Sequence, residues 1–316
     1  MHTQQNPRFK KSLLAAALLP AALMLGGPAQ AQIVIDDWSL DLTNVDDLGT
    51  TVGGPLVVEP ISQITFFGIA HAQTDDTNGN SLPDPGEFGT TDGLLSATGF
   101  QKTGGGAILP GDSRLGVNYE MTFDFSIDAV NVNSPFLDFV HIAPDVPGAT
   151  TDGLLEIYID NFAKGRVLAN QVTGDGYTDG VKIATFQVVS GAGGVFTPAT
   201  FDGSDDATFV LISALPGVIL DSDGNDIGLP GALLGLTDSN FDGDPENKGF
   251  FSVPAPTNGI LGNGGGSAID FYAEEDGSSR IAAIPEPGTL ALFGGALLGM
   301  VGLRRRKRKC SRRFDA

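Results

Sequence analysis

Apolar and polar residues alternate strictly along residues 119–128, where Tyr119 and each later odd position are apolar and Glu120 and each later even position are polar. Because successive side chains of a strand point to opposite faces of a sheet, this period of two predicts a strand with one face in the core and one in water. Further strand-like runs lie at 33–42, 60–70, 136–143, 154–160, 181–189, 207–214 and 268–273. No long window outside the two chain ends follows the 3.6-residue period of a helix, so the pattern predicts an all-β fold.

Turn signals separate these predicted strands at short intervals, and most of them are Asp-Gly pairs. They lie at 92–93, 152–153, 175–176, 179–180, 202–203, 223–224 and 276–277. Short connections favour antiparallel neighbours, so we expect an antiparallel β-sandwich or jelly roll over residues 32–261, as one large domain or two small ones. A Gly-rich pre-anchor segment is expected over residues 262–283.

The first 31 residues have the three parts of a secretory signal. Basic residues at 8–11 precede an apolar run over 13–25, and small residues lead to Ala31 and Gln32. We expect a signal helix, passage through the Sec translocon and cleavage between Ala31 and Gln32. A retained membrane anchor is disfavoured because the apolar run is short and interrupted by Pro20.

The C-terminal segment, residues 284–316, combines a proline-acid-proline triplet, an uncharged apolar run over 289–303 and a basic tail over 304–313. The triplet is Pro285, Glu286 and Pro287, and the tail begins with Arg304, Arg305 and Arg306. A helix over 289–303 would reach about 22 Å, short of the roughly 30 Å hydrocarbon layer. The basic tail places this end on the cytoplasmic side, so residues 32–284 are expected outside the inner membrane.

In this order and at this end of the chain, the three features resemble the sorting signal of bacterial PEP-CTERM proteins. The resemblance implies recognition by an exosortase-type membrane protease, cleavage near the triplet after a transient inner-membrane stage, and release or attachment at the surface of an exopolysaccharide-producing Gram-negative bacterium. It covers only the C-terminal segment and does not identify the function of the rest. Residues 154–160 and 249–253 are similar to PEP-CTERM members associated with flocculation.

Charge is distributed very unevenly along the chain. Of its 18 Lys and Arg residues only 7 lie within residues 32–285, whereas 36 of its 38 Asp and Glu residues do, which gives that region a formal charge of −29. A surface this acidic repels phosphate backbones, which excludes nucleic acid as a partner and favours cations. The single cysteine, Cys310, lies in the basic tail, so the exported region contains no disulfide, zinc-thiolate site or cysteine nucleophile.

Residues 76–87 have the ligand order of a twelve-residue calcium loop, with oxygen-bearing side chains at positions 1, 3, 5, 9 and 12 and a backbone carbonyl at position 7. The candidate ligands are Asp76, Asn78, Asn80, Leu82, Asp84 and Glu87. Position 6 is Ser81 rather than the usual glycine, and position 8 is Pro83. A calcium ion and a solvated turn therefore both remain open readings.

Two other acidic stretches begin like calcium loops but lack the closing carboxylate. Asp221, Asp223 and Asn225 are followed by Ala232 at position 12. The second stretch has Gly249 there, and its weaker candidate ligands are Asp238, Asn240, Asp242 and Asp244. Both are interpreted first as turns.

Hydrolase signals are weaker than the calcium signal. Ser113 lies in a segment similar to the nucleophile block of one esterase family, and Asp138 and His141 have the spacing of its second block. That family requires an α/β sheet, and the chain has no Gly-x-Ser-x-Gly elbow. We therefore expect no catalytic residues, and read His71 and His141 as strand residues. Paired carboxylates for glycoside hydrolysis stay open, because the acids are too numerous for spacing to choose a pair.

These observations predict a non-enzymatic surface or matrix protein whose acidic domain, with or without Ca2+, contacts exopolysaccharide or neighbouring cells in aggregation, flocculation or biofilm. The alternative is a carbohydrate-binding module or glycan-active enzyme, which would display aromatic side chains; Trp38 is the only tryptophan. A spacer whose sole role is to be displayed is the third reading.

Overall fold

The fold is known from a computed structural model that describes residues 33–35, 37–75, 77–79, 84–133, 138–170, 173–197, 202–227, 233–244 and 267–283. The strands of the described chain pair antiparallel, and between them lie two short helices, α2 (Leu48–Val52) and α3 (Pro110–Ser113), and one 3-10 turn, η2 (Phe162–Lys164). The predicted all-β, antiparallel class is therefore confirmed. The signal helix and the C-terminal apolar helix lie outside the described residues.

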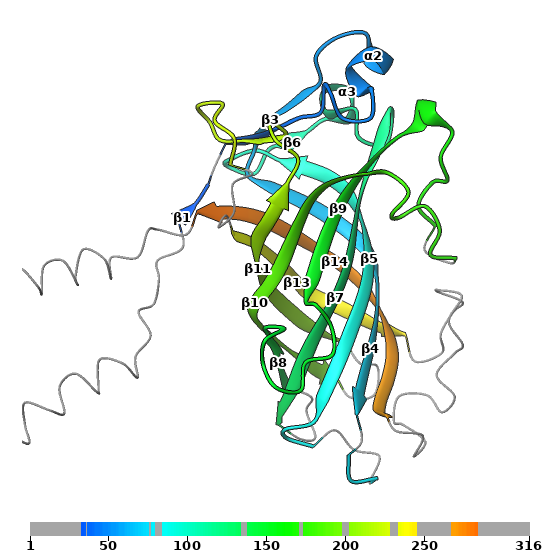
Figure 1. The fold of residues 1–316 in the computed structure, drawn as a ribbon, viewed down its shortest axis with the longest axis vertical. Coiled ribbons are helices and arrows are strands. Elements are labelled where there is room, and N and C mark those ends of the chain that lie inside the picture. Colours follow the sequence, from blue (N-terminus) through cyan, green and yellow to red (C-terminus); the bar gives the residue numbers. More distant parts are fainter. Residues whose placement is uncertain are drawn as a thin grey trace, which may run out of the picture. The chain divides into compact units, whose positions relative to one another are not determined.

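Most strands belong to one large sheet that closes on itself (Figure 1). Its members are β1 (Ile33–Val34), β4 (Gln63–Asp75), β5 (Phe88–Gln101), β6 (Ala107–Ile108), β7 (Tyr119–Asn133), β8 (Asp138–Ile142), β9 (Leu154–Asn161), β10 (Val181–Thr197), β11 (Asp202–Ala214), β13 (Leu233–Asp244) and β14 (Ser267–Ala283). Neighbours follow the order β5-β4-β14-β13-β11-β10-β9-β7, and β7 pairs with β5 to complete the ring. Strand β8 continues the place of β9 between β7 and β10. Closure leaves the ring without a free edge.

The pleat divides each strand into an inner and an outer face. On β7 the odd positions, such as Met121 and Phe123, are almost fully buried in the core. A second sheet of β2 (Trp38–Asp41), β3 (Val57–Ile61) and β12 (Ile219–Leu220) lies near α2 at one end of the ring (Figure 1). Trp38 and Leu40 of this sheet belong to the same core cluster as β7, so one hydrophobic core connects both sheets.

Three predicted turns lie in strands instead. The Asp-Gly pairs at 92–93, 202–203 and 276–277 fall within β5, β11 and β14. At Gly93 the reason is packing: Gly93 pairs with Phe125 across β5 and β7, and a Cβ atom on Gly93 would lie 2.1 Å from two ring carbons of Phe125. The glycine marks the close approach of an aromatic ring rather than a reversal of the chain.

The expected domain boundary also moves. The sequence predicts residues 267–283 as part of the pre-anchor segment, but they form β14, which pairs with β4 along one side and with β13 along the other. Residues 34–283 form one compact unit. The prediction of a linker rests on the glycine stretch at 262–266, which lies outside the described residues.

Substitution of Gly93 by alanine tests the close packing inside the ring. The added methyl group would displace Phe125, so we expect Gly93→Ala to lower the free energy of unfolding by about 1–3 kcal/mol. Gly106→Ala is the matched control, because no atom lies within 4 Å of a Cβ placed there. Urea denaturation of both variants measures the difference, and equal midpoints would contradict the assigned packing.

Candidate functional site: acidic clusters on the closed sheet

The calcium-like loop is described in part. Asn78, Asp84 and Glu87 lie within the described residues, whereas Asp76, Asn80 and Leu82 lie outside them. Glu87 is only 4% exposed although it is a carboxylate. Its backbone is fixed against β7, because Asn131 N–H donates to the Glu87 carbonyl at 2.9 Å.

The Glu87 side chain closes this loop by accepting hydrogen bonds from both of its arms. Oε1 accepts from the N–H and the hydroxyl of Thr77 at 2.8 and 2.9 Å, and Oε2 accepts from Asp84 N–H at 2.8 Å. Asn78 Nδ2 donates to Asp84 Oδ2 at 2.5 Å. Positions 3, 9 and 12 of the predicted loop are thus connected in series, because Asn78 bonds Asp84 and Asp84 bonds the buried Glu87. A carboxylate offers about four lone-pair sites, so bidentate binding of a cation by Glu87 would compete with the Thr77 donors.

The two weaker stretches have different structures. Asp221 forms the expected turn, and its carboxylate accepts from the backbone N–H groups of Asp223 and Asn225 at 2.9 and 2.8 Å. The other stretch does not form a turn: its four residues lie in β13, paired with β11 and β14. These four are Asp238, Asn240, Asp242 and Asp244. Pairing on both sides, with a register shift between Asp238 and Asp242, holds this stretch extended rather than curled into a loop.

The esterase-like residues are not brought together as a triad. Ser113 is buried in α3, where its hydroxyl donates to the Leu109 carbonyl. His141 lies on β8, and its Nε2 is 2.7 Å from Asp205 Oδ1 on β11. The carboxylate beside this histidine therefore belongs to Asp205 rather than to the predicted partner Asp138. The side chain reaches across β10 at Gly191, where a Cβ would lie 2.5 Å from the imidazole. Within the described ranges, no three His, Cys, Asp or Glu side chains converge on a metal-sized site.

A further acidic cluster lies on the outer face of β7 and β9, and sequence reasoning did not find it. Glu120 of β7 stands directly opposite Asp160 of β9 in the register. Directly opposed like charges destabilise a sheet unless something neutralises them. The side chain of Asp160 is only 2% exposed, and no hydrogen bond reaches either of its oxygens from the described part of the chain. The alternation along residues 119–128 predicts that Glu120 faces outward. It does not reveal that Asp160, forty positions later in the sequence, lies opposite Glu120.

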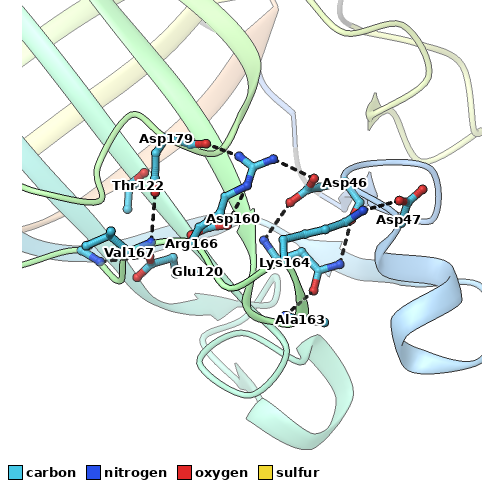
Figure 2. Close-up of polar contacts among 12 residues, drawn as sticks. Asp46, Asp47, Glu120, Thr122, Asp160, Ala163, Lys164, Arg166, Val167 and Asp179 are labelled. Carbon is cyan, nitrogen blue, oxygen red and sulfur yellow. Dashed lines mark hydrogen bonds and ion pairs between the residues drawn. The ribbon is translucent and has the colours of Figure 1, made fainter.

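Arg166 is the nearest cation to this pair (Figure 2). Its Nε lies 3.5 Å from Asp160 Oδ1, and one terminal nitrogen donates to Asp46 Oδ1 at 2.9 Å. The other terminal nitrogen donates to the Asp179 carbonyl. The Arg166 guanidinium thus pairs with the carboxylates of Asp160 and Asp46 and with the backbone carbonyl of Asp179. Lys164, nearby, pairs with the exposed Asp47 instead.

Both opposed carboxyl groups hold protons more tightly than usual. Burial raises the pKa of Glu120 to about 7; the hydrogen bond from Ala169 N–H opposes this rise, and the charges of Asp160 and Asp179 add to it. Burial likewise raises the pKa of Asp160 to about 6, with Asp179 and Asp46 adding to the rise and Arg166 opposing it. Near neutral pH this pair therefore carries less charge than two ordinary carboxylates.

A second opposed pair, Asp124 and Glu156, lies on the same two strands but is neutralised differently. Burial, together with the charges of Glu156 and Asp92, raises the pKa of Asp124. Burial would also raise the pKa of Glu156, but hydrogen bonds from Lys182, at 2.6 Å, and from the Tyr158 hydroxyl outweigh it and lower that pKa. Here a lysine supplies the positive charge that Glu120 lacks.

Comparison with known proteins identifies the C-terminal end. Residues 283–307 match the family model of the PEP-CTERM protein-sorting motif. The chain carries a PEP-CTERM sorting motif. It is therefore an exported protein processed by an exosortase, with a surface or extracellular destination. No curated protein and no solved structure matches the chain.

This match confirms the resemblance to PEP-CTERM sorting signals that the proline-acid-proline triplet and the arginine tail indicate. All of the predicted sorting residues and both residues of the predicted signal cleavage site lie outside the described residues. Among the described residues, no helix is long and apolar enough to cross a membrane. The membrane stage of sorting thus remains an expectation from the sequence.

Replacing Arg166 tests how strongly the acidic cluster depends on one cation. We expect Arg166→Met to lower the free energy of unfolding by about 1–3 kcal/mol at pH 7.5, because Asp46 loses its charged donor and Asp160 its counter-charge. At pH 5 the loss should be smaller, since Asp160 then takes up a proton.

Chemical denaturation at both pH values measures this difference. Lys164→Met is the matched control, because Lys164 and Asp47 form an exposed pair that should matter little. If both variants lose the same free energy of unfolding, or if the loss in Arg166→Met does not change with pH, the cluster does not depend on the Arg166 charge.

Proposed function

We propose that this PEP-CTERM protein is a non-enzymatic component of the cell surface or matrix that binds divalent cations, with Ca2+ at residues 76–87, and thereby promotes contact with exopolysaccharide or with neighbouring cells. The observation that carries the proposal is the buried carboxylate of Glu87, which accepts from Asp84, while Asp84 in turn accepts from Asn78, all three at positions typical of a calcium loop. The sorting motif supports it by placing the domain outside the cell.

The charge of the exported region supplies the mechanism. A region with formal charge −29 repels anionic polysaccharide and repels other copies of itself. Divalent ions bound at carboxylates can bridge two anionic partners, whereas monovalent ions only screen them. Aggregation, flocculation and biofilm formation are processes in which such bridging would operate.

A carbohydrate-binding module or glycan-active enzyme is less well supported. Sugar recognition by stacking requires an aromatic ring on the surface, but the only tryptophan, Trp38, is 1% exposed and belongs to the core. Tyr119 and Tyr177 are equally buried. Among the described residues, the exposed large hydrophobic side chains are all aliphatic, which favours ionic bridging over stacking.

Calcium binding can be tested on the purified mature protein. We expect Ca2+ to raise the melting temperature, with about 2.7 kcal/mol of stabilisation when free Ca2+ exceeds Kd a hundredfold. Glu87→Gln should abolish most of this rise, because an amide cannot bind the ion bidentately. Glu59→Gln, at an exposed position on β3, should leave it intact. A calcium response of Glu87→Gln equal to that of the wild type would exclude this loop as the site.

The cellular role has a separate test. Cells producing the protein should settle faster than a deletion strain, and a calcium chelator should remove that difference. A strain producing Glu87→Gln at the same surface level should settle like the deletion strain. If deletion and chelation both leave settling unchanged, the protein has no role in aggregation, whatever it binds.

A further inference from the structure

The last strand of the ring leads into the sorting motif without a spacer. Strand β14 ends at Ala283, and the match to the PEP-CTERM motif begins at residue 283. Only Ile284 separates the strand from Pro285, the first residue of the triplet. Cleavage in the first part of this motif leaves the residues before the cut on the ring. The protease must therefore bind a segment that borders directly on β14.

The end of β14 is fixed in the sheet up to this border. Ile281 and Ala282 are paired with β13 along one edge. They are only 3% and 1% exposed, and Ile281 belongs to the hydrophobic core. Proteins that bind an extended peptide use its main-chain hydrogen bonds and place its side chains in pockets. Neither the main chain on the β13 edge nor these two side chains are available for such binding.

The other edge of β14 changes its partner shortly before the strand ends. Strand β4 pairs with β14 as far as Ser279, which stands opposite Ile64. Beyond this point β1 takes the place of β4, because β1 also pairs with β14. Ile35, directly after β1, donates its N–H to the Ile281 carbonyl at 3.0 Å. The first strand of the described chain thus covers the edge that β4 leaves open.

Strand β1 is short and lies at the start of the described chain. It has two residues, and Ile35 is only partly buried where it packs against the core. Terminal segments with few contacts open locally at a lower cost in free energy than the central strands of a domain. Detachment of β1 would leave one edge of Ile281 unpaired, while the other strands of the ring keep their neighbours.

We propose that β1 is a clasp that restricts exosortase cleavage at the sorting motif of the folded protein. With β1 docked, both edges at the end of β14 are paired, and the protease cannot bind the residues that precede the motif. With β1 detached, one edge is open, and Ile281 and Ala282 can leave the sheet. Cleavage of the folded ring therefore waits for β1 to open, and the closed ring is a poor substrate.

Pulse-chase immunoblots of the producing bacterium measure this restriction, because loss of the C-terminal segment shortens the chain. A Gly-Ser spacer of about ten residues after Ala283 separates the motif from the ring and should speed cleavage at least about fivefold. Ile35→Pro removes the N–H donor to Ile281 and should speed cleavage by a similar factor, about that of one backbone hydrogen bond. A chain with both changes should be cleaved no faster than the spacer variant, because the spacer already frees the motif.

Gly93→Ala is the matched control for a general loss of stability. It is expected to destabilise the ring at the contact with Phe125, away from β1 and from the end of β14. Because the clasp opens locally, this variant should be cleaved at the wild-type rate. A wild-type rate in the spacer variant or in Ile35→Pro would overturn the proposal, and so would equal acceleration by Gly93→Ala.

Amide hydrogen exchange of the purified mature protein tests the clasp without the protease, which keeps the proposal testable if Ile35→Pro is exported poorly. In this variant the protection factor of the Ile281 amide should fall at least about fivefold. The amide of Ile69, within β4 and fully buried, should keep its protection. Unchanged protection of Ile281 would show that β1 does not hold the end of β14, and would overturn the clasp.

Discussion

The pleat of a closed sheet is the constraint on which the rest of this structure depends. Ring closure through β5 and β7 removes every free edge, so each strand must place alternate side chains in a common core and on a common outer surface. In a chain this acidic, many outward positions are carboxylates, and antiparallel pairing sets some of them directly opposite one another. Burial stabilises the apolar side chains of the core, whereas each opposed carboxylate on the outer face needs a cation or a hydrogen-bond donor of its own.

Carboxylates of the described residues are stabilised in two ways, by a cation or by hydrogen-bond donors. Glu156 is neutralised by Lys182 and a tyrosine hydroxyl. Asp128, which is 2% exposed, accepts from the backbone N–H groups of Thr150 and Thr151, so a loop supplies its donors. Glu87 uses backbone donors in the same way. At Glu120 and Asp160 neither a lysine nor a full set of donors is present, and burial raises the pKa of both carboxyl groups.

The sequence predicts what is local in this fold. Period two along residues 119–128 identifies β7 and its inward face correctly, because the pleat acts on neighbouring residues. Asp92-Gly93 misleads, because the same dipeptide serves a turn or the packing of Phe125 over a glycine, and only the partner strand decides. Ring closure and the Glu120–Asp160 pair depend on which residues of separate strands lie opposite one another. The alternation of apolar and polar residues within one strand does not contain that information. The sorting motif was recognisable because all of its signals lie within one short segment.

Export changes what these carboxylates respond to. Inside a cell, pH and free Ca2+ are held within narrow limits, but a protein sorted to the surface meets whatever its surroundings supply. Glu87 and the Glu120–Asp160 pair differ in their hydrogen-bond donors. Glu87 accepts from Thr77 and Asp84 and would bind a cation bidentately only by giving up its bonds to Thr77, whereas Asp160 accepts from no donor among the described residues. A cation at Glu87 and a proton at Glu120 or Asp160 would therefore bind at separate places on the same acidic domain.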